Sequence, residues 1–234
     1  MIYSLDPIYW LFVGPPILLA LWAQWRVKST FSRYSRVGNA RGLTGAEAAA
    51  VMLRHAGIDN VDIRRTGGYL SDHYNPVNRS LALSPDVHDG RSISAIGVAC
   101  HEAGHAIQHA TRYRLLGLRS RVVPFAKIGG WLAWPMIILG LILQMKGLAM
   151  IGVIAFGALV LFQLVTLPVE FDASRRAKEQ LRDLGLTVNA EEDRGVAKVL
   201  GAAAMTYVAA TIQAVAQLLY FLYILGFFGR RGSA

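Results

Sequence analysis

The sequence predicts a mainly α-helical membrane protein, with about four transmembrane helices and a small α+β domain on the cytoplasmic side. Three observations support this fold class. Hydrophobic residues make up 54% of the 234 residues, and the mean hydropathy is +0.38, which points away from a soluble globular protein. Four apolar runs are long enough to cross a bilayer. A long segment of mixed composition, residues 26–127, separates the first run from the second.

The four apolar runs differ in how they are bounded. Residues 8–25 are uncharged, with Tyr and Trp near the ends, which is typical of a transmembrane span. No basic residue precedes them and no A-x-A-like site follows, so we expect an anchor and not a cleaved signal peptide. Residues 128–145 and 148–169 are separated only by Lys146 and Gly147, which predicts a membrane hairpin. Residues 202–228 form the fourth run, too long for a typical buried helix of a soluble core.

The charge distribution predicts the orientation. The net charge is +9, and all but three of the 24 Lys and Arg residues lie in segments 26–127 and 170–201. By the positive-inside rule these segments face the cytoplasm, whereas the N-terminus, the 144–147 turn and the C-terminus lie outside. Basic residues beside anionic lipid headgroups account for the net charge, so we expect no nucleic-acid binding. The single cysteine, Cys100, excludes an internal disulfide and fits the reducing side of the membrane.

These patterns define the expected organisation of the chain. It comprises an N-terminal transmembrane helix, a cytoplasmic region, a transmembrane hairpin, a second cytoplasmic region and a C-terminal transmembrane helix with its tail. The corresponding segments are 1–25, 26–127, 128–169, 170–201 and 202–234.

Within the first cytoplasmic region we expect helices and short strands. Residues 44–56 predict a helix that begins at a Thr44–Glu47 capping box and ends at Gly57. Strand-like pieces follow at 61–64 and 77–83, with turn sequences before and after the second piece. Residues 92–110 lack proline and are rich in alanine and isoleucine, so they predict a further helix.

The helix at 92–110 carries the motif His101-Glu102-Ala103-Gly104-His105. Histidines four residues apart lie on the same helix face, about 6 Å apart along the axis, so both imidazoles can reach one zinc ion at roughly 2.1 Å. Glu102 lies beside them and could reach a metal-activated water without binding the metal, as the general base of a hydrolase must. The small residues Ala103 and Gly104 would leave room for a substrate backbone.

Residue spacing excludes His109 as a ligand of the same ion and does not identify the third ligand. His109 lies about 12 Å from His101 along a continuous helix, too far to share one ion, so we interpret it as structural or as a support for the ligands. The remaining ligand must come from elsewhere. Among the carboxylates Glu170 stands out, because it directly follows the third apolar run on the same predicted side of the membrane. The other candidates are His55, His73 and His88.

The sequences GVACHEAGHAIQHA and LPVEFDASRRA, together with DHYNPVNRSLALSPDVH and AAAMTYVAA, resemble the YugP-like neutral zinc metallopeptidases of bacterial membranes. More distantly, the chain is similar to HtpX-like and CAAX prenyl membrane proteases, which are gluzincins. The resemblance implies a zincin-like domain in a multi-pass protein of the bacterial cytoplasmic membrane. It implies His101, His105 and Glu170 as Zn²⁺ ligands and Glu102 as the catalytic residue. One position departs from the gluzincin pattern, since Ser174 stands where an aspartate is usual.

The predicted reaction is peptide-bond hydrolysis by a zinc-activated water, with Glu102 as general base. Tyr207, His73 and Tyr74 are candidates for the second donor to the oxyanion, and we assign Tyr207 to this catalytic role. Residues 78–83 could form an edge strand that pairs with an extended substrate, or could pair only within the domain.

The expected partners are the lipid bilayer and a protein or peptide substrate associated with the membrane. A regulatory membrane protein or a second copy of the chain is a further candidate partner. Two other functional classes stay open. A zinc-binding scaffold, or a protease that is active only with a partner, would keep the ligands, although the intact Glu102 argues for catalysis. A transporter would place ionisable groups inside its spans, and these spans have none except at their ends.

Overall fold

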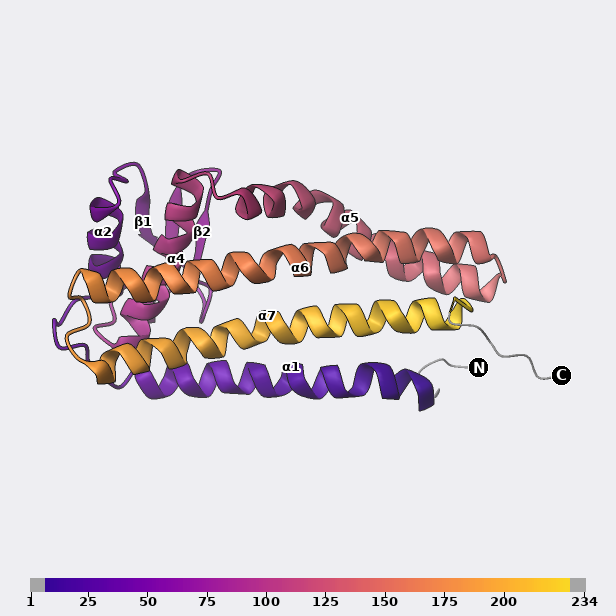
Figure 1. Cartoon of the computed structure of the whole chain (residues 1–234), viewed down its shortest axis with the longest axis horizontal. Helices are drawn as coiled ribbons and strands as arrows, with labels where there is room; N and C mark the ends of the chain where they lie inside the picture. The colour runs from indigo at the N-terminus through magenta and orange to yellow at the C-terminus, as the bar shows by residue number, and fades with distance from the viewer. Residues whose placement is uncertain (1–6, 228–234) are drawn as a thin grey trace. The chain divides into compact units, whose positions relative to one another are not determined.

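A computed structural model describes residues 7–227, so the first six residues and the predicted C-terminal tail at 228–234 lie outside the described part (Figure 1). The chain divides into two compact units. The α+β unit consists of Ala23–Leu116 and Pro168–Met205, and the membrane unit consists of the other described residues. The units are described separately below.

The membrane unit is built from parts of four long helices, labelled in Figure 1. They are α1 (Pro7–Tyr34), α5 (Arg114–Ile142), α6 (Lys146–Asp183) and α7 (Ala190–Ile224), and each is long and apolar enough to cross a membrane. Large apolar side chains on them are exposed, among them Leu11 (73%), Trp131 (78%) and Ile154 (69%). Exposure of this kind suits lipid contact and not water. The predicted class, a mainly helical membrane protein with a small sheet, is confirmed.

Helices α5 and α6 follow each other in the chain and pack closely through small residues. A Cβ atom built on Gly129 would clash with the carbonyl oxygen of Ala155, so the two backbones meet directly at this position. Close approach at small residues is a common way for membrane helices to associate. Phe156 and Phe221 connect the hairpin to α7 by an edge-to-face ring contact with centroids 5.3 Å apart.

The helices extend beyond the predicted apolar runs. Helix α5 begins at Arg114, before the run that starts at residue 128, and α6 continues to Asp183, well past Val169. The apolar runs mark only the depth of the hydrocarbon layer, whereas helical hydrogen bonding can continue into a polar sequence that packs against other elements. As a result, α1, α5, α6 and α7 each contribute residues to both units.

The α+β unit contains the two predicted helices. Helix α2 (Gly45–His55) begins with the Thr44–Glu47 capping box, in which each side chain accepts a hydrogen bond from the backbone of the other residue. Gly57 follows its end with a φ of +67°, a left-handed conformation that favours glycine. Helix α4 (Ile93–Ala110) is capped by Ser92, packs against α2 and is buried along most of its length in the core of the unit.

Three short strands form one sheet in the order β1-β3-β2. Strand β3 (Ser80–Leu83) pairs in parallel with β1 (Asp62–Arg65) and antiparallel with β2 (His73–Asn75). A four-residue helix, α3 (Pro85–His88), follows β3.

Residues 78–83 pair within the domain, the second of the two alternatives, and one turn prediction was wrong. The strand expected at 77–83 is β3, which is fully buried and lies in the centre of the sheet, so residues 78–83 are not an edge strand. The free edge next to α4 belongs instead to β2, which lies within residues that we had interpreted as a turn. At three residues β2 is too short to show an alternating pattern of apolar and polar positions.

Candidate metal centre

Helix α4 presents two histidines to one point in space. His101 and His105 are one turn apart on the same face, and their ring centroids are 4.9 Å apart. Their side chains are only 12% and 9% exposed. Burial of α4 on its other faces fixes this orientation, because Ala99, Cys100 and Ala103 on the same turns lie in the apolar core.

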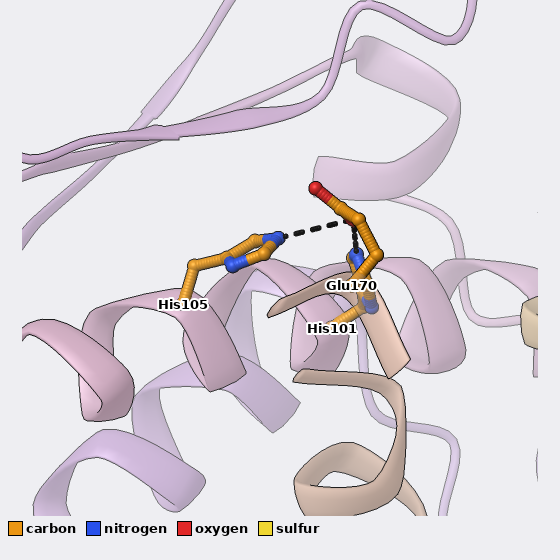
Figure 2. Close-up of side chains that lie close together, drawn as sticks. All are labelled: His101, His105 and Glu170. Carbon is orange, nitrogen blue, oxygen red and sulfur yellow. Dashed lines mark hydrogen bonds and ion pairs between the residues drawn. The ribbon is translucent and has the colours of Figure 1, made fainter. Parts of the chain in front are cut away.

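Glu170 of α6 completes a cluster of three potential ligands, shown in Figure 2. Its Oε2 lies 3.2 Å from Nε2 of His101 and 3.4 Å from Nε2 of His105. One ligand atom from each residue lies within 4.8 Å of the others, and the Glu170 side chain is 3% exposed. Among the described residues this is the group of histidine and carboxylate side chains whose geometry suits a metal ion.

These three residues fit a zinc ion. Two ligands of a tetrahedral zinc, each about 2.1 Å from the metal, lie about 3.4 Å apart, close to the two separations measured here. In both histidines Nδ1 already has a hydrogen-bond partner, so Nε2 is the atom that points to the carboxylate. Two imidazoles and one carboxylate form a typical ligand set of a catalytic zinc site, which keeps a further position open.

Two side chains orient the histidines, and we had assigned this role to neither of them from the sequence. The Ser174 hydroxyl lies 3.1 Å from Nδ1 of His101, and Oε1 of Gln108 lies 2.9 Å from Nδ1 of His105. Gln108 is fully buried and donates from Nε2 to the Val169 carbonyl oxygen and to Asp172. Contacts of this kind fix the ring orientation of metal-binding histidines. Ser174, which stands four residues after Glu170 in place of the aspartate usual in gluzincins, therefore makes the contact to His101.

Spacing would have been enough to find both residues. Gln108 is three residues after His105 and Ser174 is four residues after Glu170, so each lies on the same helix face as the ligand near it. Asp172 supports the site through Gln108, from which it accepts a hydrogen bond. Ion pairs with Arg175 and Arg176 hold Asp172 in place.

Glu102 lies next to the cluster but is not part of it. It is buried, and its Oε2 accepts a hydrogen bond of 2.9 Å from the backbone N–H of Tyr74 in β2. Its charge also acts on Asp72, whose pKa is raised first by burial and further by the negative charge of Glu102. Asp72 in turn accepts hydrogen bonds from the backbone and hydroxyl of Ser84, which fastens the start of β2 to the end of β3.

The other candidate residues lie elsewhere. His109 pairs with the Tyr74 hydroxyl, 2.8 Å from its Nδ1, and does not belong to the three-residue cluster. His73 is exposed, and its Nδ1 lies 2.9 Å from the carbonyl oxygen of Ser71. Tyr207 is half-buried on α7, in the membrane unit. The two other histidines we considered also lie outside the cluster, with His55 exposed and His88 beside Asp89.

The small residues of the motif serve packing between helices. A Cβ atom built on Gly104 would lie 2.7 Å from the carbonyl oxygen of Ala173 in α6, and Ala103 is fully buried in the core. Our expectation that these residues leave room for a substrate backbone was therefore wrong. Gly104 instead lets α4 and α6 approach each other where Glu170 meets the two histidines.

We expect Gly104→Ala to disturb the metal centre. The added methyl group meets backbone atoms of α6, so the helices must separate, at a cost of about 1–3 kcal/mol in folding free energy. Zinc content per chain and thermal unfolding of the purified protein would measure this. Gly97→Ala in the same helix is the matched control, since its Cβ would meet the Val196 side chain at an ordinary 3.6 Å. Equal zinc content and stability in both variants would contradict the packing role of Gly104.

Comparisons with known proteins identify the family of the chain. A family model described as "Putative neutral zinc metallopeptidase" matches residues 9–226. The chain is also 46% identical over 206 residues to a Bacillus subtilis (strain 168) protein named "Putative membrane protease YugP", which covers 88% of this chain and 91% of the relative. No solved structure matches the chain.

Proposed function

Because the chain belongs to this neutral zinc metallopeptidase family, we propose that it is a membrane-embedded zinc endopeptidase that hydrolyses peptide bonds of membrane-associated proteins or peptides. The observation that carries the proposal is the buried cluster of His101, His105 and Glu170 with Glu102 beside it. A zinc-binding scaffold would need the three ligands only. A buried glutamate held next to them by a backbone N–H has a use in catalysis.

In the proposed mechanism each residue of the site has a separate task. His101, His105 and Glu170 hold the zinc ion, and Ser174 and Gln108 keep the two imidazoles oriented. The ion, when bound, would supply Lewis-acid activation of the attacking water and of the substrate carbonyl.

Glu102 moves the proton. The backbone N–H of Tyr74 donates a hydrogen bond to Oε2 of Glu102. We therefore assign Oε1 to take the proton from the attacking water and to deliver it to the leaving amine. Burial of the site limits access of bulk water to this exchange.

Two further roles complete the proposal. We assign Tyr207 as the side-chain donor to the oxyanion, in keeping with the sequence-based prediction. The free edge of β2 is the candidate strand for binding an extended substrate, since β2 lies beside α4 and its middle residue contacts Glu102.

Cleavage of an unfolded protein tests the proposed activity. The purified chain in detergent should cleave β-casein, and 1,10-phenanthroline, which chelates zinc, should abolish cleavage. The isomer 1,7-phenanthroline, which does not chelate, is the matched control, and added zinc should restore activity. Absence of cleavage by zinc-loaded protein, or cleavage unaffected by the chelator, would contradict the proposed function.

We further propose that the active site faces the cytoplasm of a bacterial cell. The proposal rests on the concentration of Lys and Arg in segments 26–127 and 170–201. Since α5 and α6 form a hairpin, the segments before and after it should lie on one side of the membrane, as a site made from His101 and Glu170 requires.

Single cysteines should report this orientation. Cysteines placed at the exposed positions Asn60 and Asn189 should be protected from an impermeant thiol reagent in intact cells, whereas one at the exposed Gly147 should be labelled. The native Cys100 should stay unlabelled in folded protein, because burial raises the pKa of its thiol to about 12. A Cys100→Ser background provides the control. Labelling at Asn60 and Asn189 with protection at Gly147 would contradict the proposed orientation and show that the site faces outward.

A further inference from the structure

His109, the third histidine of the motif region, has no role in the metal cluster. Its Nδ1 lies 2.8 Å from the Tyr74 hydroxyl, and the two rings are tilted at 55° with centroids 5.9 Å apart. Both side chains are half-buried, so the contact is partly shielded from water. With the His109 proton on Nε2, the tyrosine hydroxyl donates this hydrogen bond.

Tyr74 contacts α4 at a second point, through its backbone. Its N–H donates to Oε2 of Glu102, which is seven residues before His109 in the same helix. Seven residues correspond to about two helical turns, so Glu102 and His109 lie on one face of α4, about 10 Å apart along its axis. The middle residue of β2 therefore bridges this face, with its backbone at the proposed catalytic base and its hydroxyl at His109.

Strand β2 needs such a support because it has few other constraints. It has three residues, it pairs on one side only, and the segment before it contains Gly68 and Leu70 with positive φ. Asp72 and Ser84 fasten its beginning. A short pair of strands has little stability of its own. Without a second anchor, the position of the Tyr74 N–H relative to Glu102 would be loosely defined.

We propose that Tyr74 and His109 form a brace that fixes β2 against α4 and thereby holds the Glu102 carboxylate in its working position. The effect of this brace on catalysis rests on the proposed function, because the brace concerns the same site. Tyr74 and His109 are positioning residues here. They do not bind the metal or move the proton, so loss of the brace should leave zinc in place.

The tests are Tyr74→Phe, His109→Leu and the double variant. Each single change should lower kcat about three- to tenfold, the usual range for one lost hydrogen bond, with zinc content unchanged. The double variant should lose no more than either single one, because both remove the same contact. His109→Gln should restore part of the activity, since its amide can bond to the tyrosine hydroxyl. Tyr69→Phe, at an exposed position before β2, is the matched control.

Hydrogen exchange of the zinc-loaded protein provides a readout without substrate. The Tyr74 amide should exchange faster in Tyr74→Phe and His109→Leu, by a factor similar to the loss in kcat, while the amides in the centre of α4 stay protected. Unchanged exchange at Tyr74 would overturn the brace. Faster exchange with unchanged kcat would overturn its link to catalysis. If the wild-type protein cleaves no substrate, the proposed function fails, whereas the exchange data still decide whether the brace exists.

Discussion

Replacing Glu102 with glutamine is expected to lower kcat about 10²- to 10⁴-fold, the usual contribution of a general base, while the purified protein keeps its zinc. Glutamine has nearly the same shape, and its amide oxygen can still accept the hydrogen bond from the Tyr74 N–H. It cannot take up a proton from water. Glu102 is not one of the three proposed metal ligands, so the site should load normally.

Zinc content and cleavage of β-casein, measured on the same preparations, test this expectation. Glu191→Gln, an exposed glutamate at the start of α7, is the matched control and should retain full activity. Wild-type activity in Glu102→Gln would contradict the assignment of the general base. Loss of zinc from this variant would show that Glu102 contributes to metal binding.

Replacing Glu170 with alanine should have the largest effect on the metal. It removes one of the three proposed ligands and leaves two buried histidines without the carboxylate that both contact. Changes in the residues that orient the ligands typically cost about 10- to 100-fold in metal affinity, so loss of a ligand itself should cost more than about 100-fold. Proteolysis should disappear with the zinc.

Two variants serve as comparisons for Glu170→Ala. Glu179 lies on the same helix as Glu170, but its side chain is 51% exposed, so Glu179→Ala should not change zinc affinity. His109→Ala should also keep zinc, because His109 pairs with Tyr74. Competition with a chromophoric chelator measures each affinity. If His109→Ala loses zinc and Glu170→Ala retains it, the third ligand is wrongly assigned.

Much of the fold could be predicted because its signals are local. An apolar run of sufficient length identifies a transmembrane helix, and a capping box identifies the beginning of a helix, as at Thr44. The motif at 101–105 was equally local, since two histidines one turn apart share a face wherever the helix forms. The ends of the long helices were less predictable, because packing and not composition decides where α5 begins and α6 ends.

The remaining features depend on contacts between distant segments. The three residues of β2 become a strand only because β3 lies beside them. Gln108 and Asp172 are 64 residues apart, and Ser174 reaches His101 over 73 residues, so the hydrogen bonds that orient the site follow from the meeting of α4 and α6. That meeting depends on Gly104, whose role in helix packing is not visible in the motif itself.

Titration of metal-free protein with zinc, with bound metal and β-casein cleavage followed on the same samples, tests the central claim most directly. The His101, His105 and Glu170 centre predicts that activity rises in proportion to bound zinc and reaches its maximum at about one ion per chain. Cleavage that is already present without zinc, or no cleavage when the site is fully loaded, would contradict the claim that this chain is a zinc peptidase.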